Sequence, residues 1–62
     1  MYFISVVFVV RGKDNKNQAQ IRGFYGTSFE DCIKKMHKFK DEMRKNSTPV
    51  IQHTIIDVEV KW

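Results

Sequence analysis

The stretch that decides the fold is Tyr2–Val10, YFISVVFVV, in which Ser5 is the only residue that is not apolar. The run is too short to cross a bilayer as a helix, which needs about 20 apolar residues. Its β-branched and aromatic side chains are typical of a strand. Successive side chains of a strand point to opposite faces of the sheet, and here both sets are apolar. We therefore expect a central strand that needs cover on both faces.

The size of the chain limits what can supply that cover. Its 62 residues are expected to form one compact domain, residues 1–62, near the lower limit for independent folding. A single cysteine excludes an internal disulfide, and no Cys/His cluster suits zinc. Association with a second copy or with another protein is the remaining source of stability.

A polar segment and a second strand follow the apolar stretch. Residues Gly12–Asn17, GKDNKN, are rich in turn formers and predict a hairpin tip. The next segment, Gln18–Tyr25, alternates only weakly between apolar and polar residues, which favours an edge strand. Within it, Gly23 indicates a β-bulge or a close approach by another part of the chain.

The third element is expected to be an amphipathic helix that ends near Asn46. Two pairs have capping-box spacing at its start, Thr27 with Glu30 and Ser28 with Asp31. Apolar residues then recur at steps of three and four, which predicts the face that packs on the sheet. These residues are Phe29, Cys32, Ile33, Met36, Phe39 and Met43.

The last segment, Val50–Trp62, is expected to be a third strand with one buried face. Its apolar residues Ile56, Val58, Val60 and Trp62 alternate with Asp57, Glu59 and Lys61. With a right-handed crossover after the helix, this strand lies antiparallel beside the first. The sequence thus predicts an α+β fold, β-β-α-β, with a three-stranded antiparallel sheet in the order 2-1-3 and one helix on one face.

One helix leaves the other face of such a sheet bare. The bare face is expected to carry Phe3, Val7 and Val9, with Trp62 as a further interface anchor. The last strand is expected to add either Ile51 and Ile55 or Ile56 and Val58. Uncovered apolar surface usually marks an interface, and both outer strands have open edges. We therefore expect a homodimer, paired face to face or edge to edge; the alternative is a monomer that binds another protein.

The net charge of +4 permits an anionic partner without requiring one. Ion pairs at i,i+4 spacing explain most of the charge on the helix. The pairs are Glu30–Lys34, Asp31–Lys35, Lys38–Glu42 and Asp41–Lys45.

One basic group is not explained by such pairs. His37, Lys40 and Arg44 fall on one flank of the helical wheel, and Lys40 lies within the apolar stripe. A lysine there either extends its stem over the core or faces a ligand near the sheet edge. With Arg22 or Arg11 opposite, this flank predicts an anion-binding site for a signalling nucleotide or nucleic acid.

No pattern of residues indicates catalysis, so we expect no enzyme activity, no metal site and no cofactor. Cys32 lies on the apolar stripe and is expected to be a small core residue. His37 stands five positions further on, which does not place the two side chains together. His53 is isolated near the start of the last strand, and no paired carboxylates suit acid/base chemistry.

The run Val6-Val7-Phe8 after a short apolar start, together with the length and the Lys-, Ile- and Phe-rich composition, carries a resemblance. The chain resembles the very small early proteins of lytic phages, and among them the Dmd-type antitoxins of T-even phages. This resemblance implies a counter-defence protein that binds and inhibits a host protein, and it implies no site residues. The lone cysteine and the absence of leader features also predict the cytoplasm, that of the host cell if the protein is phage-encoded.

Overall fold

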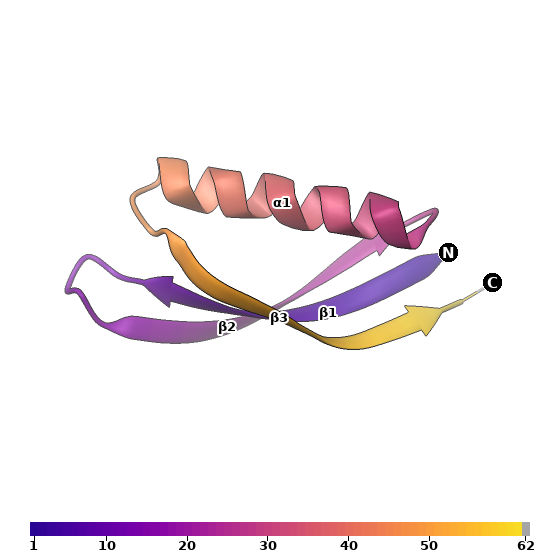
Figure 1. Ribbon diagram of the computed structural model, residues 1–62, viewed down its shortest axis with the longest axis horizontal. Helices are drawn as coiled ribbons and strands as arrows, with labels where there is room; N and C mark the ends of the chain where they lie inside the picture. Colours follow the sequence, from indigo (N-terminus) through magenta and orange to yellow (C-terminus); the bar gives the residue numbers. More distant parts are fainter. Residues whose placement is uncertain (62) are drawn as a thin grey trace.

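The computed structural model describes residues 1–61 and shows one helix lying across one face of a three-stranded sheet (Figure 1). The elements are β1 (Tyr2–Arg11), β2 (Asn17–Gly26), α1 (Phe29–Lys45) and β3 (Val50–Val60). The strands are antiparallel and lie in the order β2-β1-β3. The α+β fold and its strand order are as the sequence predicts. Trp62 lies outside the described residues.

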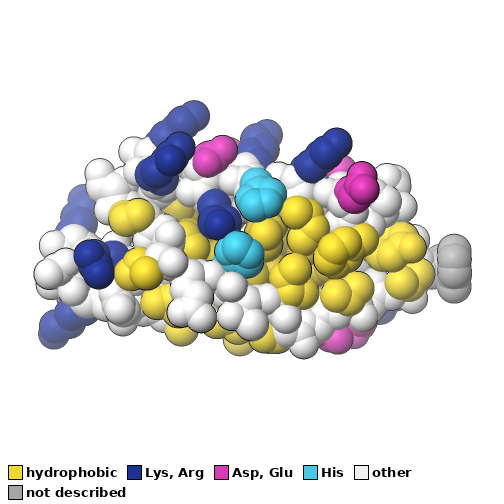
Figure 2. All heavy atoms as spheres, in the orientation of Figure 1, with side chains coloured by type: hydrophobic (Ala, Val, Ile, Leu, Met, Phe, Trp, Pro, Cys, Tyr) yellow, Lys and Arg dark blue, Asp and Glu magenta, His cyan; other side chains and the backbone are white. Residues whose placement is uncertain are grey.

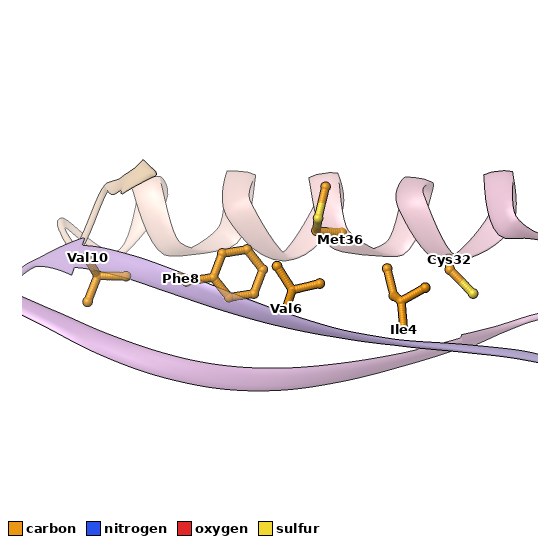
Figure 3. Packing of buried hydrophobic residues seen from close by; sticks show 6 residues of the cluster. All are labelled: Ile4, Val6, Phe8, Val10, Cys32 and Met36. Carbon is orange, nitrogen blue, oxygen red and sulfur yellow. The ribbon is translucent and has the colours of Figure 1, made fainter. Parts of the chain in front are cut away.

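The core lies between the helix and one face of β1. From Ile4 to Val10, side chains at even positions of β1 are buried, whereas those at odd positions are partly exposed. Figure 3 shows Cys32 and Met36 pointing from α1 towards the β1 side chains. The buried cluster consists of Ile4, Val6, Phe8, Val10, Cys32 and Met36. Full burial of such a side chain contributes about 1.5–3 kcal/mol.

Three aromatic rings set the position of the helix on the sheet. Phe8 of β1, Phe24 of β2 and Phe39 of α1 pack together, with ring centroids 5.0 Å apart for Phe8–Phe39 and 5.9 Å for Phe24–Phe39. The Phe8 and Phe24 rings meet edge to face at 6.1 Å. Such pairs add about 0.5–1.5 kcal/mol beyond the area they bury. The helix is therefore held over β1 and β2.

β3 receives less cover than its sequence pattern predicts. Ile56, Val58 and Val60 were expected to be buried, yet they are 53%, 47% and 47% exposed. The prediction that these residues form a buried face is wrong because α1 lies mainly over the other two strands. Val50 and Ile55 are the partly buried residues that β3 adds to the core.

The junction between β2 and α1 is tight and well capped. Ser28 is the N-cap, and its Oγ accepts a hydrogen bond from the Asp31 N–H at 3.1 Å. Asp31 Oδ2 accepts in turn from the Thr27 N–H at 3.2 Å, so the second predicted capping pair is the one that forms. A Cβ on Gly26 would lie 2.9 Å from the Cys32 nitrogen, which leaves no room for a side chain there.

The other end of α1 closes with a Schellman motif. The Thr48 N–H donates to the Met43 carbonyl at 3.0 Å, and the Ser47 N–H donates to that of Arg44 at 3.2 Å. Ser47 adopts a φ of 63°, the left-handed conformation that this motif needs. The Thr48 hydroxyl also donates to the Met43 carbonyl, so the start of β3 is held close to the helix.

We expect Gly26→Ala to lower the free energy of unfolding by about 1–3 kcal/mol, because the new methyl group overpacks the junction. Urea denaturation followed by circular dichroism measures this change. Gly12→Ala is the control, since its nearest neighbour would be the end of the Asp14 side chain at 3.0 Å and not backbone. Equal midpoints for Gly26→Ala and the native protein would contradict this account of the junction.

Candidate functional site

The face of the sheet opposite the helix is uncovered. Cross-strand partners share a face of the sheet, so the register identifies its residues. We call this surface the open face. It consists of Phe3, Ser5, Val7 and Val9 on β1, Ala19, Ile21, Gly23 and Tyr25 on β2, and Gln52, Thr54, Asp57 and Glu59 on β3. The β1 and β2 part is mainly apolar, and the β3 part is polar.

Each of the two predicted sets from β3, Ile51 with Ile55 and Ile56 with Val58, has one member that does not lie on this face. Ile55 pairs with Val6 and Val58 pairs with Ile4, which places both on the helix side. An odd and an even position share that side because the register shifts between Ser5 and Val6, and it shifts again between Val9 and Val10. The predicted sets from β3 are therefore wrong. β2 supplies the apolar neighbours instead.

Phe3, Val7 and Val9 are partly exposed on the open face, as the sequence predicts. Ile21 and Tyr25 of β2 extend this apolar surface and are 70% and 59% exposed. The alternation along Gln18–Tyr25 places both residues on the same face of the strand, but it was too weak to identify them as part of this surface.

Gly23 allows the Phe3 ring to lie close against β2. A Cβ on Gly23 would stand 2.6 Å from Phe3 Cζ, and the Phe3 and Tyr25 ring centroids are 4.8 Å apart. The β1–β2 register continues through Gly23 without a shift. The glycine therefore marks a close approach and not a bulge.

A second apolar surface runs along the side of the molecule between α1 and β3, which the helix leaves uncovered. Figure 2 shows hydrophobic side chains gathered beneath the helix there. We call it the α1–β3 strip, and it consists of Phe29, Ile33, Ile56, Val58 and Val60. A hollow of about 390 Å³ beside the first turns of α1 is lined by Phe29, Glu30, Ile33 and Lys34.

The basic flank of α1 borders a second hollow, of about 240 Å³. His37, Lys40 and Arg44 line it, so the structure brings together three of the four candidate anion-binding residues. We call it the basic hollow; Asp41, Pro49 and Val50 complete its lining. Arg22 does not join the group.

Arg22 lies instead on β2, which β1 separates from β3. Its guanidinium carbon is 5.5 Å from the centroid of the Phe39 ring. This is cation–π geometry. Arg11 donates its backbone N–H to the Pro49 carbonyl at 3.1 Å and thereby supports the rim of the basic hollow.

The helix charges pair less than their spacing predicts. Within residues 1–61, Asp31–Lys35 at 3.7 Å is the one predicted i,i+4 pair that forms. Asp41 Oδ1 lies 3.7 Å from an Arg44 nitrogen instead of pairing with Lys45. These exposed pairs contribute about 0–1 kcal/mol each.

His53 is the functional candidate that sequence reasoning missed. Lys40 Nζ lies 3.1 Å from His53 Nδ1. An ammonium group only donates hydrogen bonds, so Nδ1 accepts and the imidazole is neutral, with its proton on Nε2. Partial burial, followed by the charges of Lys40 and His37, lowers the pKa of His53 from its ordinary value of 6.5. His53 pairs with Phe8 on the helix side of the sheet, and only the register between β1 and β3 reveals this position.

The lone cysteine lies in the core. Cys32 is buried, and its Sγ lies 3.6 Å from the Tyr2 carbonyl oxygen, consistent with the small core residue that was predicted. Residues 1–61 contain no group of three His, Cys, Asp or Glu side chains placed to hold a metal ion. No helix in this range is long and apolar enough to cross a membrane.

Comparison with known proteins assigns no family. The chain matches no family model, no curated protein and no solved structure. The resemblance to phage early proteins therefore stays a prediction. The function is argued from the open face, the α1–β3 strip and the basic hollow.

We expect Lys40→Gln to raise the pKa of His53 towards its ordinary value, because the variant removes a cation 3.1 Å from Nδ1. Titration of the imidazole C–H signals by NMR measures this shift. Lys38→Gln on the exposed side of α1 removes the same charge and should leave the pKa of His53 unchanged. An unchanged pKa in Lys40→Gln would contradict the assigned contact.

The sign of the effect on stability follows from the lowered pKa. The unfolded chain binds the proton of His53 more tightly than the folded protein does. The neutral imidazole therefore favours the fold above pH 6.5, and this contribution is lost as the pH falls from there through the lowered pKa.

Proposed function

We propose that the protein acts by binding another protein on its open face. The observation that supports this most is the exposure of β1. The strand is apolar on both sides, and the single helix covers only its even positions. Ile21 and Tyr25 widen the bare surface into a patch of the kind that marks interaction sites.

The size of the open face favours a partner of different sequence over a second copy. Three strands of about ten residues cover about 33 Å by 14 Å, or roughly 450 Å². Stable interfaces bury about 800 Å² on each partner. Two such flat faces pressed together fall short of that area. A larger protein that also encloses the rim of the face reaches it.

The charges on the face define the chemistry of that partner. Asp57 and Glu59 lie on the β3 part, beside the apolar part formed by β1 and β2. A complementary surface has an apolar centre for Phe3, Val7 and Ile21, with basic groups towards β3. The resemblance to phage early proteins favours a host defence protein in this role, which the bound chain inhibits by covering its surface without catalysis.

We assign homodimer formation to the outer edge of β3. An edge strand presents unpaired N–H and C=O groups, and a two-fold axis pairs two such edges at once. The α1–β3 strip lies next to this edge, so edge pairing also brings two copies of Ile56, Val58 and Val60 together. The open face stays free for the other protein.

We expect Ile21→Lys to weaken binding of the partner protein by at least about tenfold, because it places a charge in the centre of the interface. Ile21 is 70% exposed, so the fold should tolerate the change. The partner is captured from bacterial extract on the immobilised protein and identified by mass, and its affinity is then measured by calorimetry. Val58→Lys on the opposite side of the sheet is the matched control. Equal affinity in both variants would sink the assignment of the open face.

The same two variants also test the dimer, and here Val58→Lys is the disruptive change and Ile21→Lys is the control. Sedimentation equilibrium of the native protein at micromolar concentration should give twice the mass of the chain. Val58→Lys should give monomers because it places like charges across the two-fold axis, whereas Ile21→Lys should remain dimeric. A native protein that sediments as a monomer would show that β3 does not pair with a second copy.

A further inference from the structure

We propose that the basic hollow binds the phosphate dianion of a small ligand, held by Lys40 and Arg44 and completed by His37 and His53. This site is independent of the open face, which lies on the other side of the sheet. The inference stands on the hollow lined by His37, Lys40 and Arg44, and on the contact between Lys40 and His53.

The walls of the hollow are held in place from both sides. The Schellman motif fixes Ser47 and Thr48 against Met43, and these residues lead directly into Pro49 and Val50. The Arg11 N–H secures the Pro49 carbonyl at the end of β1. Ligand binding therefore requires movement of side chains but not of the backbone.

The charges in the hollow favour an anion. Lys40 and Arg44 outweigh Asp41, whose carboxylate lies 3.7 Å from the Arg44 guanidinium. The charges of Lys40, Arg44 and Asp41 give the lining a net charge of about +1, and protonation of His53 beside it adds a further positive charge. Figure 2 shows both histidines together on this side of the molecule.

The contact between Lys40 and His53 changes when an anion enters. In the empty hollow, Lys40 Nζ donates to the lone pair of His53 Nδ1 at 3.1 Å. A phosphate oxygen is a stronger acceptor for an ammonium group. Once Lys40 turns to the anion, Nδ1 is free to take a proton from solvent and to donate to a second oxygen. Binding of the anion is thus coupled to uptake of a proton.

The groups around His53 agree with this coupling. From α1 it faces Lys40 and His37, and both lower its pKa in the absence of ligand. β1 places the apolar Phe8 opposite it. Asp41 and Arg44 line the rest of the hollow. A bound anion offsets the positive charge of Lys40 and raises the pKa of His53 again.

The volume restricts the class of ligand. About 240 Å³ is less than the roughly 300–1,000 Å³ of sites for drug-sized molecules. It accommodates a phosphoryl group and a part of its carrier. A phosphate monoester has close to two negative charges at neutral pH, whereas each phosphodiester of a nucleic acid has one. The hollow therefore suits a monoester such as a nucleoside monophosphate.

Sulfate is the first probe, because it remains a dianion while His53 titrates. The imidazole and backbone N–H signals of the native protein are followed by NMR as sulfate is added. The imidazole signals should shift saturably, and the affinity should rise about tenfold if the pKa of His53 increases by one unit on binding, as the pH falls from about 7.5 to about 5.5. Adenosine monophosphate should produce the same shifts.

The variants separate a defined site from general charge. Lys40→Gln and Arg44→Gln should each weaken sulfate binding about tenfold, and Lys38→Gln, which makes the same charge change on the exposed side of α1, less than about twofold. Circular dichroism establishes whether each variant is folded. If Lys40→Gln is not folded, Lys40→Arg takes its place and should show binding in part.

Three results would overturn the proposal. The first is imidazole signals that do not move saturably with sulfate. The second is equal loss of affinity in Lys38→Gln and Lys40→Gln. The third is tighter binding of a single-stranded oligonucleotide than of adenosine monophosphate with a steep dependence on salt, which would identify a nucleic-acid surface instead. None of these results bears on the open face.

Discussion

The structure depends on the burial of one strand that is apolar on both faces. One helix packs on β1, and it covers the even positions of the strand. The two neighbouring strands satisfy the hydrogen bonds of β1 on both edges but leave its odd positions towards solvent. The same constraint therefore produces the small core and the exposed surface.

The second determinant is the aromatic cluster of Phe8, Phe24 and Phe39. It contains one ring from each of β1, β2 and α1, so it pulls the helix towards β2 and away from β3. This displacement exposes the α1–β3 strip. It also leaves space near the end of the helix, where Lys40 meets His53. Both secondary surfaces thus follow from the position of three rings.

Much of the fold was predictable because its signals are local. The apolar run of β1, the capping residues Ser28 and Asp31, and the three-and-four spacing of the helix each depend on residues close in sequence. The open face was predictable in part, since Phe3, Val7 and Val9 alternate with the core residues. The flank formed by His37, Lys40 and Arg44 follows from helix geometry alone.

The failures have a common origin in pairing between distant residues. Two register shifts between β1 and β3 place Ile55 and Val58 on the same side, which no alternation along β3 reveals. The same register brings His53 to Lys40, and the strand order separates Arg22 from them. Sequence periodicity shows which residues of one element share a face, but it does not show the register between two paired strands.

The irregular pairing of β3 has a further consequence for how the protein avoids fibrils. A long, flat and apolar edge is a template on which strands add without limit. The two register shifts interrupt β3 near its middle and near its start, and bulges of this kind increase the local twist of a strand. A bent edge accepts a neighbour over a short length and does not offer a straight ladder for the next. The two irregular positions thus make β3 a poorer template for repeated strand addition than a straight edge of the same length.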